Sequence, residues 1–336
     1  MAELSDQLLM WTILGYALAM LGYAAEYAFS ANGAVARVAA APRLELGTAS
    51  GGGGPERVHD PLWDDPDGVA SSVADVETAP PPASDKGRRA ALFGKIGVIL
   101  TGIAAMAHGG ALVTRGLAAE RVPWGNMYEF ITSSIAMAMV IYLIAALGFG
   151  LSSFGLPTTL LASVAVGLAV TVFYVDVSPL MPALHSVWFV IHIVAAALAG
   201  AVFNIGGIAA ALYLLKQRAE RKGVTTGYLA RLPESAVLDR FSYRLHAFAF
   251  PLWTFAVAAG AVWAQYAWGR FWGWDPKETW SLVTWIVYAA YLHARATAGW
   301  KGTRAAVLAL IGLVTFWWNF VGVNLLLDGL HSYAGI

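Results

Sequence analysis

The chain contains no cysteine among its 336 residues. This absence excludes intrachain disulfides, thiolate metal ligands and a cysteine nucleophile. Any thiol chemistry in which the protein takes part must therefore use the thiols of a substrate or of another protein.

Charged residues are also scarce, at 12% of the chain, whereas they make up about 25% of soluble globular proteins. The formal net charge is zero, so the composition gives no electrostatic reason to expect nucleic acid or an acidic partner. Hydrophobic residues account for 58% of the chain and the mean hydropathy is +0.61. This composition is typical of a polytopic membrane protein.

Long apolar stretches recur along the chain, and each of eight could cross a hydrocarbon core about 30 Å thick, which takes roughly 20 helical residues. We therefore expect an all-α polytopic membrane protein with about eight transmembrane helices. The expected spans are 7–29, 90–113, 127–149, 157–175, 186–215, 246–267, 279–298 and 305–327. Glu3 and Asp6 stand where a signal peptide would have basic residues, so we expect the first helix to be retained.

The segment between the first two spans, residues 30–88, differs in composition from the rest of the chain. It contains four consecutive glycines at 51–54, three prolines at 80–82 and scattered charges. Because nothing in it could bury a core, we expect a disordered cytoplasmic tether. The chain then divides into a first transmembrane helix at 1–29, the tether, and a seven-helix core at 89–336.

Lysine and arginine gather in alternate loops. One set of loops holds Lys86, Arg88, Arg89, Lys216, Arg218, Arg221, Lys222, Arg295, Lys301 and Arg304. The opposite set holds only Arg115, Arg121, Arg270 and Lys277. Since basic loops stay in the cytoplasm, we expect both termini and the loop around Arg270 to lie outside.

A tryptophan-rich stretch, residues 268–280, forms that external loop and the start of the following helix. It contains Trp268, Trp272, Trp274 and Trp280, together with glycines and a polar Asp-Pro-Lys-Glu insert. Tryptophan gathers at any membrane interface, but an interfacial belt requires neither this density nor the polar insert. We expect an external interfacial segment that offers an aromatic surface to a large planar ligand.

The second half of this stretch has the pattern of a helix start. Asp275 fits the N-cap, Pro276 the first helical position and Glu278 the position whose side chain reaches back to the cap. The next helix is thus expected to begin at the outer surface. Arg270 and Lys277 bracket the tryptophans, and we expect them to bind the propionates of a haem as charge-assisted partners.

Histidines are the candidate iron ligands, since ionisable residues inside a membrane are costly and imidazole is the commonest axial ligand of haem. His192 falls about two turns into the fifth span and His331 follows the eighth. Both are expected at the outer surface, beside the tryptophan-rich stretch. Together they could coordinate one haem iron from its two faces.

Two further histidines are expected deeper in the membrane. His293 lies about 14 residues into the seventh span, roughly 21 Å from its outer end at 1.5 Å per residue. It therefore marks a second, deeper haem site or a polar residue near the cytoplasmic edge. His246, at similar depth, is either its partner or an interfacial residue. His108 is either a packing residue or part of a pathway.

Several stretches of the sequence, including those described above, resemble a known protein family. The stretch at 268–280 is similar to the tryptophan-rich "WWD" signature of haem-handling proteins, and most closely to the CcsA branch, also called ResC or CcsB, of system II cytochrome c biogenesis. The likeness extends to residues 126–129, 260–264, 291–295, 322–326 and 329–333. It therefore covers most of the chain outside the tether.

The resemblance implies a haem lyase subunit that carries haem b outward and presents it for attachment to apocytochrome Cys-x-x-Cys-His motifs. His192 and His331 match the family's external ligands. His293 matches its transmembrane ligand, whose partner the family places in a ResB-type subunit. The resemblance also implies a bacterial plasma membrane location. A separate ResB-like subunit, apocytochrome c and a thioredoxin-like thiol reductant are the expected partners.

Two alternatives stay open at this point. A haem-delivery protein of the system I type would load a chaperone without a ResB-like subunit. A di-haem electron-conducting subunit would hold its haems permanently between paired histidines at matched depths on two helices. The outer histidines here lie at helix ends, which suits release of haem better than its retention.

Overall fold

The computed structural model of the protein describes residues 1–40, 85–224 and 227–331. Within these residues the secondary structure is entirely helical, which confirms the all-α prediction. The α-helices are α1 (Ala2–Ala40), α2 (Asp85–Ala119), α3 (Met127–Phe149), α4 (Gly155–Val172), α5 (Val187–Arg221), α6 (Tyr228–Arg231), α7 (Ser235–Trp268), α8 (Pro276–Ala296), α9 (Thr303–Trp317) and α10 (Val323–Leu326). Short helical turns are η1 (Ser152–Phe154), η2 (Pro182–Leu184) and the π-helical η3 (Trp318–Gly322).

Seven of the described helical segments are long and apolar enough to cross a membrane. They coincide with seven of the eight predicted spans, and the last of them runs through α9, η3 and α10. The remaining prediction, 279–298, coincides with α8, which has 21 residues but a less apolar sequence. Tryptophan, tyrosine and threonine occupy many of its positions, and α8 packs beside α7 and α9.

Several helices extend beyond the ends predicted from hydropathy. Helix α1 continues past residue 29 to Ala40, and α2 already begins at Asp85. Helical hydrogen bonding can continue into polar sequence, so a helix can extend beyond the end of its apolar stretch. The central part of the predicted tether, residues 41–84, lies outside the described residues.

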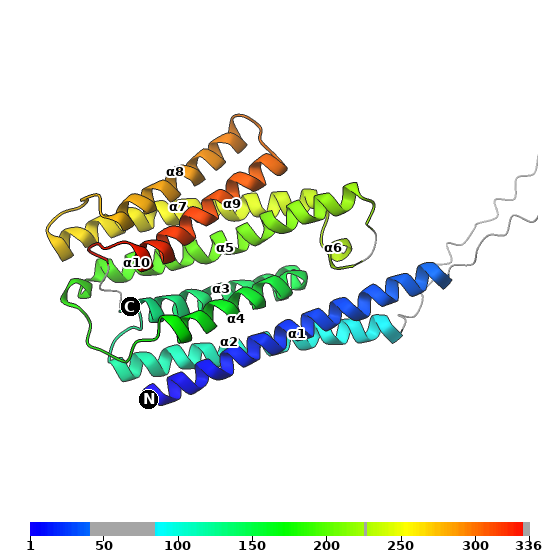
Figure 1. Ribbon diagram of the computed structural model, residues 1–336, viewed down its shortest axis with the longest axis horizontal. Coiled ribbons are helices and arrows are strands. Elements are labelled where there is room, and N and C mark those ends of the chain that lie inside the picture. The colour runs from blue at the N-terminus through cyan, green and yellow to red at the C-terminus, as the bar shows by residue number, and fades with distance from the viewer. Residues whose placement is uncertain (41–84, 225–226, 332–336) are drawn as a thin grey trace, which may run out of the picture.

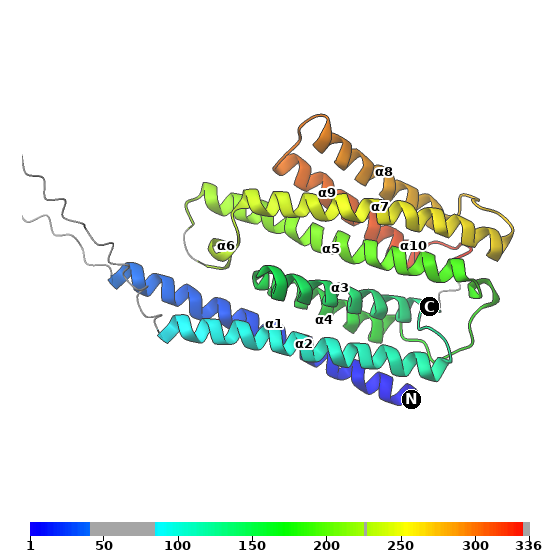
Figure 2. The same cartoon turned by 180° about the vertical axis from the view of Figure 1, so that it is seen from behind.

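The helices form two groups that meet at α3 and α5 (Figure 1). In one group α1 and α2 lie antiparallel along most of their length, with α4 against α1. In the other, α5 packs along α7, and α8 and α9 lie side by side, as the reverse view also shows (Figure 2). Helix α3 contacts α2, α4 and α5, so it joins the two groups.

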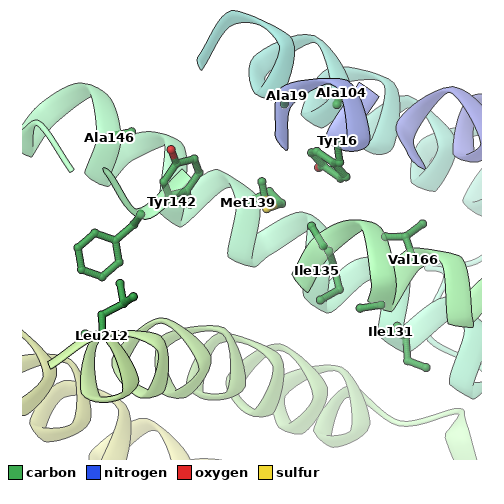
Figure 3. Packing of buried hydrophobic residues seen from close by; sticks show 14 of the residues in the cluster. Tyr16, Ala19, Ala104, Ile131, Ile135, Met139, Tyr142, Ala146, Val166 and Leu212 are labelled. Carbon is green, nitrogen blue, oxygen red and sulfur yellow. The ribbon is translucent and has the colours of Figure 1, made fainter. Parts of the chain in front are cut away.

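Small residues allow the first two helices to approach closely. A Cβ atom added at Gly15 would lie 2.8 Å from the Cβ of Ala104, and one added at Gly22 would lie 3.2 Å from the backbone of Gly97. Such small residues are how helices associate in lipid, where no hydrophobic effect drives them together. Larger side chains such as Met139 fill the space between these helices and α3 (Figure 3).

One end of the bundle collects the segments that matter for the candidate site. The N-terminus, the loops 120–126, 173–186 and 269–275, and the end of the described chain all lie there (Figure 1). Successive long helices run in alternate directions (Figure 1), which agrees with the two sets of loops that the sequence analysis distinguished by their content of lysine and arginine. That this end faces outward stays a prediction, and it is called the outer end below.

Candidate functional site

A cavity opens at the outer end between α3, α5, α7, α8 and η3, with an empty volume of about 1150 Å³ including its mouth. Most of its wall is apolar. The aromatic lining residues are Trp124, Phe130, Phe189, Trp253, Trp263, Trp268, Phe271, Trp272, Phe316 and Phe320. The polar ones are Asn126, His192, Lys277, Glu278, Ser281, Asn319, Asn324 and His331. The structure thus places both predicted outer histidines on one aromatic cavity.

His192 is fixed in one orientation by a backbone hydrogen bond. Its Nδ1 lies 2.8 Å from the carbonyl oxygen of Ala256 on α7. A carbonyl can only accept, so Nδ1 carries the hydrogen and Nε2 keeps the lone pair. Gly260 leaves room for this arrangement, because a Cβ there would lie 2.8 Å from His192 Nδ1.

His331 is held in the equivalent way by a carboxylate. Its Nδ1 lies 2.9 Å from Oδ1 of Asp275. The same oxygen accepts from the backbone N–H of Lys277, and Oδ2 accepts from that of Leu330. Burial opposes ionisation of Asp275, but the His331 contact and the two backbone hydrogen bonds outweigh it and lower its pKa to about 2. The ionised carboxylate accepts from Nδ1, which leaves the lone pair on Nε2 of His331.

Trp263 lies between the two histidines. The imidazole of His192 stacks against its ring, with centroids 5.8 Å apart and an interplanar angle of 13°. The imidazole of His331 meets the same ring edge to face at 5.7 Å. Trp268 packs 4.9 Å from both Trp263 and His331. Residues 139 positions apart in sequence are thereby joined through one aromatic cluster.

The four tryptophans of residues 268–280 do not form a single surface. Trp268 and Trp272 line the cavity, whereas Trp274 is 68% exposed and lies perpendicular to Trp272. Trp274 also has a positive φ of 59°, which turns the chain into α8. Trp280 packs on Trp318, away from the cavity lining. The stretch is a loop before α8, with one part facing the cavity and one part facing outward.

The predicted capping box at the start of α8 is present. Glu278 accepts from the backbone N–H groups of Gly273 and Asp275, at 2.8 and 3.1 Å. Its carboxylate also pairs with Arg270 at 3.3 Å. Of the two cations predicted beside the tryptophans, Lys277 lines the cavity and Arg270 does not. The cap therefore fixes the loop in which Asp275 contacts His331.

A buried ion cluster orders the loop on the other side of the cavity. Glu129 is fully buried and pairs with Arg115 at 3.0 Å and Arg121 at 2.6 Å. It also accepts from the backbone N–H of Gly125, while the Asn126 side chain caps α3. This cluster positions Trp124 and Asn126 on the cavity wall.

The two deeper histidines are not brought to a common cavity. His246 is completely buried on α7, where its Nδ1 donates to the carbonyl of Ser242 at 2.7 Å. The rings of Phe203, Tyr288 and Tyr291 surround it. His293, on α8, is exposed at the surface of the chain. Neither lines the cavity that holds His192 and His331.

The described residues contain no group of three or more His, Cys, Asp or Glu side chains that could hold a bare metal ion. Two imidazoles in an aromatic cavity suit instead a metal whose remaining ligands come from a planar macrocycle. This is the chemistry that the arrangement supports.

No ligand-binding role was predicted from the sequence for several residues of this site, among them Trp263, Trp124, Asn126 and Asn319, although Asn126 and Trp263 lie in segments that resemble the family. Trp263 carried a signal, because seven of the chain's fourteen tryptophans lie between Trp253 and Trp285. Trp124 and Asn319 carried none, since only the packing of α3 against η3 brings them to the cavity.

Comparisons with known proteins show which family the chain resembles. A family model described as Cytochrome C assembly protein matches residues 97–331. The CcsA proteins of Gloeobacter violaceus and of a Synechococcus strain are 32% and 35% identical, over 74% and 72% of this chain and 88% and 85% of their own length. The CcsA protein of Chlamydomonas reinhardtii is 35% identical over 66% of this chain and 64% of its own length.

The matched region contains α3 to α10, most of α2 and every residue that lines the cavity. The chain belongs to the CcsA family of cytochrome c biogenesis proteins.

Proposed function

We propose that this protein is the haem-transporting subunit of a cytochrome c synthase, which carries haem b outward and presents it for covalent attachment. The observation that carries the proposal is the pair of imidazoles in one aromatic cavity, each with its Nδ1 bonded to an acceptor, which assigns the lone pair to Nε2. His192 and His331 are the iron ligands in this proposal.

The cavity suits haem on three counts. Its aromatic lining offers stacking surface to a large planar ring, and its mouth opens at one end of the bundle. The backbone carbonyl of Ala256 and the carboxylate of Asp275 orient the two ligands, as outer-shell partners of metal-binding histidines do. Lys277 lines the cavity, and although burial lowers its pKa to about 7, a haem carboxylate beside it would favour its charged form.

The attachment reaction requires positioning more than acid–base catalysis. Each cysteine thiol of the apocytochrome adds to one vinyl group of haem. A sulfur–carbon bond forms at the inner vinyl carbon and the thiol proton is transferred to the outer carbon, with no net oxidation. The histidine of the substrate motif then replaces His192 or His331 on the iron. The absence of cysteine from this chain leaves no competing thiol beside the vinyl groups.

The deeper site is proposed to be shared with another protein. His293 is exposed on α8, and a ResB-like membrane subunit that packs there could supply the second ligand of a haem in transit. A thioredoxin-like reductant would keep the apocytochrome thiols reduced. We place the complex in the bacterial plasma membrane, with the cavity mouth on the outside.

A haem-delivery protein of the system I type would use the same cavity without a ResB-like subunit. A di-haem electron-conducting subunit would need paired histidines at matched depth on two helices. The arrangement of His246 and His293, one enclosed and one exposed, argues against that pairing within the chain.

The proposal is tested by recording absorption spectra of the purified chain, alone and with its ResB-like partner, before and after a Cys-x-x-Cys-His peptide is added. We expect a bis-histidine haem spectrum that shifts to that of thioether-linked haem with peptide, partner and reductant present. A peptide with serines in place of cysteines is the control. Haem that passes to a carrier protein without thioether formation would support the delivery function instead.

A further inference from the structure

Two amide side chains on the cavity wall have polar atoms without a hydrogen-bond partner. Asn126 is 7% exposed and its Nδ2 is unpaired, and Asn319 is 5% exposed and its Oδ1 is unpaired. Both residues line the cavity that holds His192 and His331. Buried amides without a partner are costly, so such a pair beside a cavity indicates a polar ligand group.

The two amides belong to one wall. Asn126 caps α3, and the first turns of α3 pack directly on the segment that carries Asn319. The ring of Phe130 lies 5.1 Å from that of Phe320, and Asn324 Nδ2 lies 2.8 Å from the sulfur of Met127. The wall is therefore built from the start of α3 and from η3.

The backbone of η3 is π-helical, from Trp318 to Gly322. Such turns are rare and occur frequently at functional sites, because the extra residue changes the direction in which side chains point. A nearby amide shows the contrast. Asn204 on α5 donates to the carbonyl of Gly200 at 2.8 Å and accepts from Trp317 at 3.0 Å, so both of its polar groups are paired.

The charged side chains on the cavity wall provide a cationic partner for only one of the two carboxyl groups of haem. Among the described lining residues, Lys277 is the only lysine or arginine and Glu278 the only carboxylate. Haem b has two carboxyl groups, and one lysine can neutralise one of them. Arg270, the other predicted partner, is bonded to Glu278 and does not line the cavity.

We propose that Asn126 and Asn319 form an amide pair that hydrogen-bonds the second carboxyl group of the haem. The inference rests on the proposed function and adds to it the way the ring is oriented. An amide can present either its NH₂ or its oxygen with little change of shape, so the pair can serve this group in its ionised or its protonated form. With its carboxyl groups fixed by Lys277 and the amide pair, the haem has one rotational setting about the His192–His331 axis. That setting decides which ring edge, and hence which vinyl groups, reach the apocytochrome.

The test compares haem b with its dimethyl ester, in which both carboxyl groups are blocked. Each is titrated into the purified full-length chain and into two variants, Asn126→Ser and Asn319→Leu. Serine also accepts from the backbone at a helix start, so Asn126→Ser keeps the cap of α3 and removes only the amide. Asn204→Leu is the control, since that amide is already paired and lies outside this cavity.

We expect each variant to lower the affinity for haem b by about tenfold, the effect of one hydrogen bond to a charged group, while affinity for the ester stays the same. The preference of the chain for acid over ester should fall accordingly, and the Soret band should keep its wild-type position because both iron ligands remain. Asn204→Leu should keep the wild-type preference.

If Asn126→Ser and Asn319→Leu bind both porphyrins as the wild type does, the amide pair is overturned and the proposed function stays intact. A wild-type chain that binds neither porphyrin would overturn the proposed function itself.

Discussion

The outer and the deeper halves of the bundle each contain a pair of candidate haem-binding histidines, but the two pairs have different surroundings. At the outer end, His192 and His331 contact the same tryptophan and line the same cavity, and each has an acceptor that fixes its ring. In the deeper half, His246 is enclosed by aromatic rings and His293 is exposed at the surface of α8. The outer pair lines one cavity of this chain, and the deeper pair does not line that cavity.

This difference teaches which site the chain completes by itself. An imidazole that packed aromatic rings enclose on several sides leaves no space for a macrocycle in this arrangement, and an exposed one needs a second ligand from elsewhere. In the proposed function, the deeper site therefore takes its second ligand from another protein, whereas the outer site takes both ligands from this chain.

The largest effect is expected from removing an outer ligand. His192→Ala and His331→Ala should each lower haem affinity by more than the roughly 10- to 100-fold that loss of an outer-shell partner costs, and should abolish covalent attachment. The measurement is haem recovered with the purified protein, together with cytochrome c yield in cells. His185→Ala is a matched control, because His185 is exposed and lies one heptad before His192. Wild-type haem content and cytochrome yield in both alanine variants would refute the ligand assignment.

The next effect concerns the carboxylate that orients His331. Asp275→Asn should weaken haem binding by about tenfold, since an amide still caps α8 but accepts less strongly from the imidazole. Haem titration followed at the Soret band measures this, and circular dichroism checks that the helices are retained. Thr279→Ala, in the same helical turn, serves as the control. Equal affinity of Asp275→Asn and the wild type would show that the Asp275–His331 contact is only structural.

A smaller effect is expected at Gly260, where an added methyl group would lie 2.8 Å from His192 Nδ1. Gly260→Ala should displace the imidazole and weaken haem binding several-fold, with a shifted Soret band. Elsewhere in a helix the same substitution adds about 1 kcal/mol of stability. Gly167→Ala is the matched control, because a Cβ there meets nothing within 4 Å. A Gly260→Ala variant with wild-type haem binding would mean that His192 has room to move.

Some of these features could be predicted from the sequence, and others could not. Hydropathy located the spanning helices, and the Asp-Pro-x-Glu pattern of residues 275–278 predicted a capping box that the structure contains. These are local properties, which depend on neighbours within one or two helical turns. The depth of His246 and His293 was also predictable in outline from the rise of a helix.

The direction in which those side chains point was not predictable. A shift of one or two positions around a helix turns a residue from the core to the surface, and only the packing of α7 against α5 and α8 encloses His246. The same holds for Asn126 and Asn319, 193 positions apart in sequence and joined by one wall of the cavity. Long-range packing of this kind leaves no pattern in a single sequence.

The smallest effect on the isolated chain is expected from His293→Ala, and this variant distinguishes the outer half of the bundle from the deeper half. His293 is exposed, so His293→Ala should change the stability of the isolated chain by no more than about 0.5 kcal/mol. Haem added to that chain in solution should bind the outer site as in the wild type. In cells with the ResB-like partner, the same substitution should lower the haem that reaches the outer site, because transit through the shared site is blocked.

The control is His246→Phe, which keeps an aromatic ring in the same enclosure and should leave both readouts unchanged. A loss of outer haem with His246→Phe and not with His293→Ala would reverse the roles assigned to the two residues. An equal loss with both would mean that the chain forms the deeper site from its own histidines after rearranging α7 and α8.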